Sequence, residues 1–451
     1  MEQAAAKPLF TNQTLRRLIV PLLIEQVLVV LVGLADVAMV SSVGEAAVSG
    51  VSLVDMINVL ILNLFSGMAT GGAVVAAQLL GAGRRKDACS AASQLMSVTI
   101  LISVAVTVLV LLAQRPLLRL FFGSITEDVM DCALTYLQIT ALSYPFIACY
   151  NSGAALFRSM NGARVTMIVS AAMNVINIAG NAFCVYGLSL GVAGVAVPTL
   201  VSRAFSAVVI FILLSRRGQE IFIRFSEMLR PDFATIRRIL YIGIPSALEN
   251  SMFQLGRVLV VSIISGFGTV QIAANAVANN LDSVGCIPGN AMNLAIITVI
   301  GQCVGAGDYD QATYYMKKMM KLTYLIMGSC CAAVLLSMPL LLQLYNLSEE
   351  TMQLSAILIL IHNGLAIFLW PAAFTLSNGL RAASDVRFTL IHSVLSMWLF
   401  RILFSWILGQ MLGLGAIGVW IAMVLDWIYR AAVFIWRFHS GRWKELAKID
   451  G

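Results

Sequence analysis

The sequence predicts an all-α protein that crosses a membrane many times, and three observations support this class. Hydrophobic residues make up 60% of the 451 residues and charged residues only 11%, against about 25% charged in soluble domains. Uncharged runs recur that exceed the roughly 20 residues needed to cross a bilayer as a helix. The same order of motifs also occurs twice. We therefore expect a polytopic membrane protein built from two similar halves.

The uncharged runs and their breaks predict twelve transmembrane helices. Backbone groups in hydrocarbon must pair within their own segment, which favours helices. The short alternating segments of a membrane β-barrel do not occur. The expected helices cover residues 18–41, 53–80, 89–113, 132–157, 165–186, 195–214, 239–265, 276–302, 322–345, 352–378, 388–409 and 414–436.

The two halves repeat each other in a constant register. Pro-Leu-Leu-Ile-Glu at 21–25 recurs as Pro-Ser-Ala-Leu-Glu at 245–249, and Gln-x-x-Gly-Ala-Gly occurs at 78–83 and 302–307. Both pairs have the spacing that separates Pro21 from Pro245, which we call the repeat offset. Six helices precede the second copy, so both copies have the same orientation in the membrane. The expected organisation is an N-terminal six-helix lobe (1–214), a cytoplasmic linker (215–238), a C-terminal six-helix lobe (239–437) and a cytoplasmic tail (438–451).

Basic residues predict the topology. Of the 29 Lys and Arg residues, the helix pattern places all but five on one side of the membrane with both termini. Arg115 and Arg119 lie on the other side, and Arg203, Arg257 and Arg401 lie within helices. This asymmetry predicts that both termini of an inner (plasma) membrane protein are cytoplasmic. The net charge of +7 then favours contact with anionic lipid rather than nucleic acid.

Several classes of protein are disfavoured. The polar segment from Met1 to Arg17 leads directly into a helix, so we expect no cleaved signal peptide. The eight cysteines fall mostly inside helices, without a Cys/His cluster, so we expect neither disulfides nor a metal site. The Gly-Ala-Gly turns lack the residues of a phosphate-binding loop. No nucleophile–base motif is apparent, so an integral membrane enzyme is the least favoured class.

Asp36 is the leading candidate for a functional site, because an ionisable group inside a membrane helix is costly unless it is paired or hydrated. It lies about 10 Å to the outer side of the first helix's midpoint. Asn174, Asn177 and Asn181 share one face of the fifth helix. Their amides could bind a cation or share hydrogen bonds with a carboxylate. The alternatives are an acid that faces water and amides that only join helices.

On the duplicated plan, the chain resembles the multidrug and toxic compound extrusion (MATE) family, DinF-like or NorM-like, over its whole length. The motifs that carry the resemblance are Pro21, Asp36-x-x-Met39-Val40, the two Gly-Ala-Gly turns, Leu156-Phe157-Arg158 with Arg164, and Gly379-Leu380-Arg381 with Arg387. The family fold implies two six-helix lobes around a central cavity that opens alternately to each side.

The resemblance also implies roles for individual residues. In DinF-like members an aspartate in the place of Asp36 binds the coupling cation, and Pro21 resembles the proline at which that helix bends. Asn177, Asn181 and Thr199 correspond to the network around that aspartate. Asn181 stands where many of those members have an acid, which leaves Asp36 as the only titratable group of the cluster.

Glu249 of the second half resembles the membrane glutamate of NorM-type members. Asn250, Gln254 and Arg257 follow it on one helix face, and an ion pair between Glu249 and Arg257 is the plainer alternative. Trp370-Pro371 occupies the place of the NorM-type aspartate, which favours proton over sodium coupling. We expect the substrate cavity to include Met39, Asn151, Met173, Gln254 and Arg257, although the methionines could equally be lipid-facing filler.

The resulting hypothesis is an antiporter that exports organic, cationic or amphipathic compounds by alternating access. Protons are the favoured coupling ion and sodium is possible. A lipid-linked precursor flippase and a specific metabolite or peptide exporter are the alternatives. We expect a monomer that contacts membrane lipid and a small organic substrate, with no cofactor beyond the coupling ion and no nucleic acid.

Overall fold

The computed structural model describes residues 8–123, 126–345 and 347–446, and every regular element in these ranges is helical. Eleven spans in the described chain are long and apolar enough to cross a membrane. A bent pair of helices raises the number to twelve. The predicted all-α polytopic class is therefore confirmed.

The chain forms two compact units. The N-terminal unit consists of Val27–Ala247, and the C-terminal unit combines Met1–Gln26 with Leu248–Gly451. The start of the chain joins the C-terminal unit through hydrogen bonds to one helix of that unit. The Phe10 amide donates to the Tyr315 hydroxyl at 3.0 Å, and that hydroxyl donates to the Phe10 carbonyl at 2.6 Å. The predicted lobe boundaries at the linker stay a prediction, and residues 447–451 of the predicted tail lie outside the described residues.

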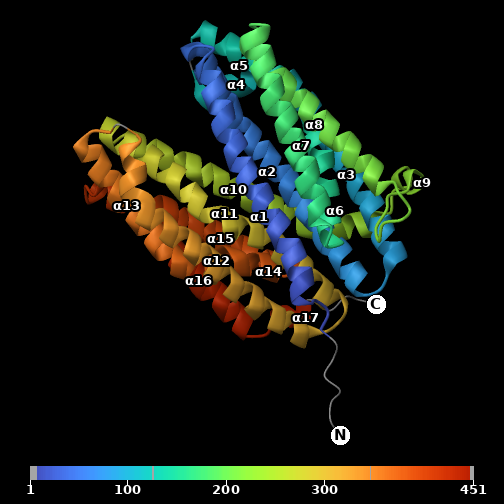
Figure 1. The fold of residues 1–451 in the computed structure, drawn as a ribbon. Helices are drawn as coiled ribbons and strands as arrows, with labels where there is room; N and C mark the ends of the chain where they lie inside the picture. Colours follow the sequence, from blue (N-terminus) through green and yellow to red (C-terminus); the bar gives the residue numbers. More distant parts are fainter. Residues whose placement is uncertain (1–7, 124–125, 346, 447–451) are drawn as a thin grey trace. The chain divides into compact units, whose positions relative to one another are not determined.

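The N-terminal unit is a bundle in which α2 packs against α3, α5 and α6, and α7 lies along α8 (Figure 1). The short α4, which carries Arg115 and Arg119, was not predicted. Both α1 and α10 contribute residues to the two units. The elements are α1 (Asn12–Ser41), α2 (Glu45–Gly81), α3 (Arg85–Leu112), α4 (Gln114–Phe122), α5 (Glu127–Leu142), α6 (Tyr144–Ser159), α7 (Ala163–Ala182), π-helical η1 (Phe183–Gly187), α8 (Ala193–Leu214), α9 (Phe225–Met228) and α10 (Phe233–Ser265).

The predicted fourth transmembrane helix is bent. It consists of α5 and α6, which meet at Ser143 at an angle of 45°. Pro145, at the start of α6, has no N–H to donate, so the backbone ladder cannot run unbroken through this point. At this bend the Ser143 hydroxyl accepts a hydrogen bond from a charged side chain that is described below.

Small residues allow α2 and α10 to cross closely within the N-terminal unit. A Cβ atom on Gly67 would lie 2.2 Å from the Cα of Ala247, and one on Gly71 would lie 2.6 Å from the nitrogen of Gly243. Neither position can hold a larger residue without a backbone shift. Such crossings of small residues are a common way for membrane helices to pack.

The repeated Gln-x-x-Gly-Ala-Gly motifs fold alike. Gly83 and Gly307 have positive φ angles of 70° and 71°. Each ends a long helix by donating to the carbonyl three residues earlier, while the following residue donates to the carbonyl five residues earlier. This is a helix C-cap of the Schellman type, which requires the left-handed backbone that glycine adopts easily. The sequence repeat is therefore also a structural repeat.

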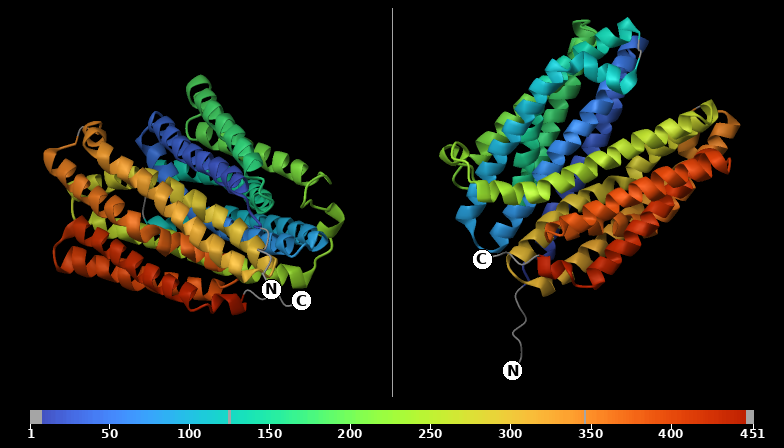
Figure 2. Two further views of the ribbon diagram at one scale, coloured as in Figure 1. Left: turned by 60° about the horizontal axis from the view of Figure 1, so that its bottom comes forward. Right: turned by 180° about the vertical axis from the view of Figure 1, so that it is seen from behind.

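The C-terminal unit contains the second set of membrane helices, seen from two further sides in Figure 2. Three π-helical turns interrupt them, and one begins at Pro371, which cannot donate a backbone hydrogen bond. The elements are α11 (Thr269–Gly305), α12 (Tyr309–Gln343), α13 (Glu349–Trp370), η2 (Pro371–Thr375), α14 (Leu376–Ala382), α15 (Val386–Ser396), η3 (Met397–Leu403), η4 (Trp406–Met411), α16 (Gly415–His439) and α17 (Trp443–Leu446).

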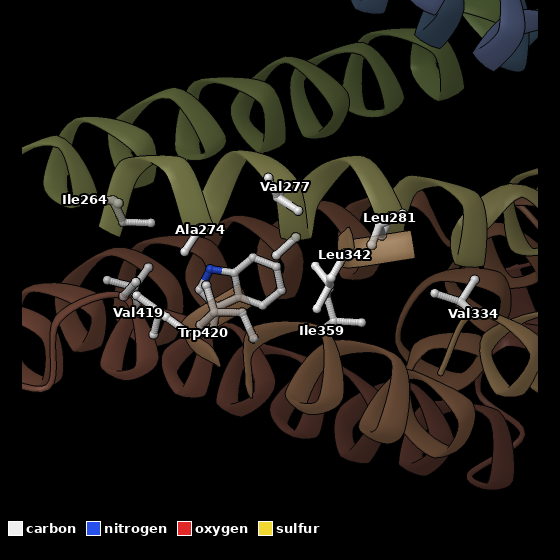
Figure 3. Close-up of a cluster of buried hydrophobic side chains, with 13 residues drawn as sticks. Ile264, Ala274, Val277, Leu281, Val334, Leu342, Ile359, Val419 and Trp420 are labelled. Carbon is white, nitrogen blue, oxygen red and sulfur yellow. The ribbon is translucent and has the colours of Figure 1, made fainter. Parts of the chain in front are cut away.

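Trp420 lies within the hydrophobic core of the C-terminal unit and contacts several of its helices. Figure 3 shows its indole ring among Ala274 and Val277 of α11 and Ile359 of α13. The indole N–H donates to the Asn275 side-chain oxygen at 3.0 Å. This bond satisfies a polar atom that would otherwise be costly to bury, and it fixes α16 against α11.

Candidate functional site

The N-terminal unit joins Asp36 to the predicted amides through a chain of hydrogen bonds. The Asn181 Nδ2 donates to Asp36 Oδ1 at 2.8 Å and to Asn177 Oδ1 at 3.3 Å. The Asn177 Nδ2 then donates to Thr199 Oγ1 at 3.0 Å. Residues from α1, α7 and α8 thus converge, as the sequence pattern and the resemblance suggested. We call Asp36, Asn177, Asn181 and Thr199 the Asp36 network.

Helical spacing explains this convergence. Asn177 and Asn181 are one turn apart on α7, so both face the same side. Asn181 is fully buried, whereas Asp36 is half-buried. Asn174 lies one turn earlier on α7, and its buried Nδ2 has no hydrogen-bond partner within the described chain. The Asn181 Oδ1 is also buried and has no hydrogen-bond partner within the described chain, so the Asp36 network itself keeps one unused acceptor.

A second carboxylate and an arginine, which the sequence reasoning did not assign, lie near the Asp36 network. The charges of Asp55 on α2 and Arg203 on α8 both act on Asp36. Asp55 accepts a hydrogen bond from Asn58 at 3.2 Å, and Asn58 in turn accepts one from Tyr144 at 2.7 Å. Asp36 is thus the single acid of the Asp36 network, but Asp55 is a second acid close to it.

Arg203 is held by the bend between α5 and α6. Its Nη1 donates to Ser143 Oγ at 2.7 Å. The sequence analysis placed Arg203 within a helix without assigning it to the site. Asp55 could have been noticed in the same way, because it is an ionisable residue within a predicted membrane helix. Asp55 escaped attention because it directly precedes the long uncharged run of the second helix.

Glu249 in the C-terminal unit forms an ion pair, but with a partner other than the one considered. Its Oε1 lies 2.7 Å from Arg381 Nη2 and accepts a hydrogen bond from Ser393 at 2.7 Å. The alternative pairing of Glu249 with Arg257 is therefore wrong. Arg381 belongs to the Gly-Leu-Arg motif, so this motif residue neutralises the buried glutamate.

A further group of buried charges lies between η3 and α16. Asp426 Oδ1 accepts from Arg430 Nε at 2.9 Å and from the Ser396 hydroxyl. Arg401 Nη1 lies 3.7 Å from the other oxygen of Asp426. Sequence reasoning placed Arg401 inside a helix but did not identify Asp426 as its neighbour.

Asp282 on α11 forms a separate contact with α13. It accepts a hydrogen bond from Asn363 at 2.5 Å and lies 3.5 Å from His362 Nδ1. His392 lies elsewhere, 2.9 Å from the Tyr429 hydroxyl. In the described chain, no three His, Cys, Asp or Glu side chains converge as they would around a metal ion.

The five residues predicted for the substrate cavity divide between the units. Met39 is buried, and Asn151 and Met173 are half-buried in the N-terminal unit. Gln254 and Arg257 belong to the C-terminal unit, where Arg257 lines a pocket considered below. Pro21 lies within α1, which runs through it without a break.

The sequence profile of the MatE family matches residues 21–183 and 245–407, more than half of the chain. The chain belongs to the MatE family. The two matched segments begin at Pro21 and Pro245, the prolines that define the repeat offset, which confirms the duplication. MatE proteins are transporters rather than enzymes, and the described helices agree with a multi-pass membrane protein of this family.

Individual relatives agree with this assignment. The transporter YisQ of Bacillus subtilis, named as uncharacterized, is 28% identical over 98% of this chain and 97% of its own length. A probable multidrug resistance protein NorM of Thermotoga maritima is 25% identical over 97% of this chain and 94% of its own. An outward-facing MATE family multidrug transporter has the same fold, with a TM-score of 0.89 at 22% identity and 96% coverage of both chains.

Proposed function

We propose that this MatE transporter is a proton-coupled antiporter that exports amphipathic organic compounds, and that Asp36 carries the coupling proton. The observation that carries the proposal is the hydrogen bond from Asn181 to a half-buried carboxylate on a membrane helix. A buried ionisable group without a counter-ion in direct contact marks a proton path in many transporters. The name of the Thermotoga maritima relative supports multidrug export.

Protonation of Asp36 changes the forces on α1. The ionised carboxylate holds the Asn181 amide by a charge-assisted hydrogen bond, which weakens when the charge is removed. Pro21 lacks the N–H that would bind the preceding turn, so α1 is weakest there. Loss of the charge then releases the outer part of α1 and shifts the balance between two states of the transporter.

The hydrogen bonding around Asp36, rather than its charge, favours a proton over a sodium ion. Asp36 and Asp55 together carry two negative charges, of which Arg203 offsets one, so one monovalent cation of either kind restores neutrality. A sodium site gathers several oxygen ligands, but Asn181 presents its N–H to Asp36 rather than its oxygen. Sodium coupling is the alternative that the experiment below separates.

A cationic substrate is the second candidate, because Asp36 and Asp55 give the N-terminal unit two carboxylates.

We further propose that the protein lies in the bacterial inner membrane as a monomer with both termini cytoplasmic. The distribution of Lys and Arg supports this orientation.

Transport in proteoliposomes tests the proposal. A pH gradient without sodium should drive movement of an amphipathic dye by the wild-type protein. Asp36→Asn keeps the size of the side chain and removes its charge, so gradient-driven movement should fall to the level of empty liposomes. Asp87→Asn, which changes an exposed carboxylate next to Arg84, is the matched control and should transport normally. Movement that needs sodium and ignores the pH gradient would refute proton coupling.

A further inference from the structure

The C-terminal unit contains a cavity of about 70 Å³ between α10, α11, η3 and α16. Two guanidinium groups, those of Arg257 and Arg401, line it together with Asn275, Asn279 and Trp420. We call it the Arg257–Arg401 pocket. Since one water occupies about 30 Å³ in the liquid, the pocket has room for a small head group, while the rest of a ligand would extend outside.

The pocket has an excess of positive charge. Arg401 is only 7% exposed, and its buried Nη1 has no hydrogen-bond partner. The nearest carboxylate, Asp426, is 3.7 Å away and is bound more closely by Arg430. In the described part of the chain, Arg257 makes neither an ion pair nor a hydrogen bond. Two arginines therefore line the pocket, and among the described residues one carboxylate, that of Asp426, lies within ion-pair distance of either of them.

The residues that line the pocket correspond, at the repeat offset, to residues in and near the Asp36 network. The pocket is positively charged, whereas the surroundings of Asp36 carry two carboxylates. At the repeat offset, Asp36, Asp55 and Thr199 correspond to Val260, Asn279 and Met423. All three of these residues line the pocket.

The first copy has no arginine at the positions that correspond to Arg257 and Arg401. Arg257 stands at the position of Gly33, and Arg401 belongs to the helix that corresponds to α7. The second copy has thus lost both carboxylates of the first at this place and gained two guanidinium groups.

We propose that the Arg257–Arg401 pocket binds the carboxylate of an amphipathic organic acid, and that the transporter therefore carries organic anions. This inference rests on the transport function proposed above. A guanidinium group binds a carboxylate through two parallel hydrogen bonds, and Arg257, which is exposed and has no hydrogen-bond partner among the described residues, supplies the donors. Val260 and Met423 offer apolar contact to the body of the ligand.

Binding to the full-length protein in detergent tests the pocket without any ion gradient. Calorimetric titrations at neutral pH compare naphthoate, naphthylmethylammonium and the neutral naphthalenemethanol, which share an aromatic body and differ in charge. Naphthoate should bind at least about tenfold more tightly than the other two. Arg257→Gln should weaken naphthoate binding about tenfold. Arg257→Glu should reverse the preference, so that the ammonium compound binds more tightly.

Arg119→Gln is the matched control, because it removes an exposed arginine of α4 outside the pocket and should leave the naphthoate affinity unchanged. Equal or tighter binding of the ammonium compound by the wild type would overturn the proposal, as would an unchanged naphthoate affinity in Arg257→Gln. Naphthoate binding by a protein that moves no dye in response to a pH gradient would refute the exporter function but not the binding site. Asp36-dependent export by a protein that does not bind naphthoate would do the reverse. Export of the dye without export of naphthoate would refute the transport of organic anions.

Discussion

The two copies of the repeat place polar groups on corresponding helices but use different chemistry. In the N-terminal unit, amides and hydroxyls link to one half-buried carboxylate, Asp36. In the C-terminal unit, the buried carboxylates of Glu249 and Asp426 are bound directly by Arg381 and Arg430, while that of Asp282 is bound by the Asn363 amide. In the mechanism proposed above, the first arrangement gains and loses a proton, whereas a buried ion pair resists any change of charge.

One acid on α2 and one on α11 lie at different positions of the repeat, and this shift illustrates how the two copies differ. Asp55 and Asn58 of α2 correspond to Asn279 and Asp282 of α11. The carboxylate has thus moved by three residues, about 4.5 Å along the helix. In its new place it contacts Asn363 and His362 of α13 rather than facing the pocket. The duplicated framework therefore holds its carboxylates at different positions, and with different partners, in the two copies.

Asp426→Asn should produce the largest effect on stability. Removing the carboxylate leaves Arg430 and Arg401 buried with no negative partner in contact, which costs about 3–5 kcal/mol. Asn177→Ala in the Asp36 network removes only neutral hydrogen bonds and should cost about 1 kcal/mol. The apparent melting temperature in detergent, followed by size-exclusion chromatography of heated samples, should fall clearly further for Asp426→Asn.

Asp87→Asn is the control for this comparison, because both members of the Arg84–Asp87 pair are exposed and exposed pairs contribute little. Its melting temperature should match the wild type. If Asp426→Asn and Asn177→Ala melted at the same temperature, the distinction between a fixed and an adaptable cluster would fail.

Asn181→Asp should change the coupling ion. The new carboxylate would lie within hydrogen-bond distance of Asp36, and two acids in contact cannot both be ionised without a cation. With the oxygens of Asn177 and Thr199 nearby, the pair resembles the oxygen-rich surroundings that bind sodium. We expect sodium to stimulate transport by the variant several-fold and to leave the wild type unaffected. Asn177→Asp, one turn further from Asp36, is the matched control, and equal stimulation there would contradict a requirement for direct contact.

Much of the fold could be predicted from the sequence, because membrane spans depend on composition and length. The expected helices correspond to the observed spans, and the constant spacing of the motifs correctly predicted the duplication. The bend at Ser143 was not foreseen, because the uncharged run continues across it, although Pro145 is a sequence signal for such a break. The short α4 was missed for a different reason, because a nine-residue helix has too little length for a periodic pattern.

The candidate site was only partly accessible to sequence reasoning. Asn177 and Asn181 share a helix face, so their proximity follows from helical spacing. Their contact with Asp36 on another helix came through the family resemblance. The ion pair of Glu249 with Arg381 joins α10 to α14, far apart in the chain, and no local pattern indicates which of several arginines is the partner. Long-range pairing of charges is therefore what the sequence alone did not provide.

Asp232→Ala should produce the smallest effect, and it shows what a carboxylate contributes when water surrounds it. Asp232 directly precedes α10 and accepts hydrogen bonds from the Ala234 amide at 3.1 Å and the Thr235 hydroxyl at 2.5 Å. The bond from Thr235 lowers the pKa of Asp232 below its ordinary value of 3.8. Loss of this exposed cap should cost less than about 1 kcal/mol.

Since the folded state lowers this pKa, the stabilisation by Asp232 is complete at neutral pH and disappears as the pH falls below about 4. The melting temperatures of the wild type and Asp232→Ala should therefore differ slightly at neutral pH and converge in acid. Asp232→Asn is the matched variant, because asparagine caps a helix about as well but cannot titrate. It should retain most of the cap at neutral pH and keep it in acid. A loss for Asp232→Ala as large as that for Asp426→Asn would mean that charge alone, and not burial, sets the cost of removing a carboxylate from this protein.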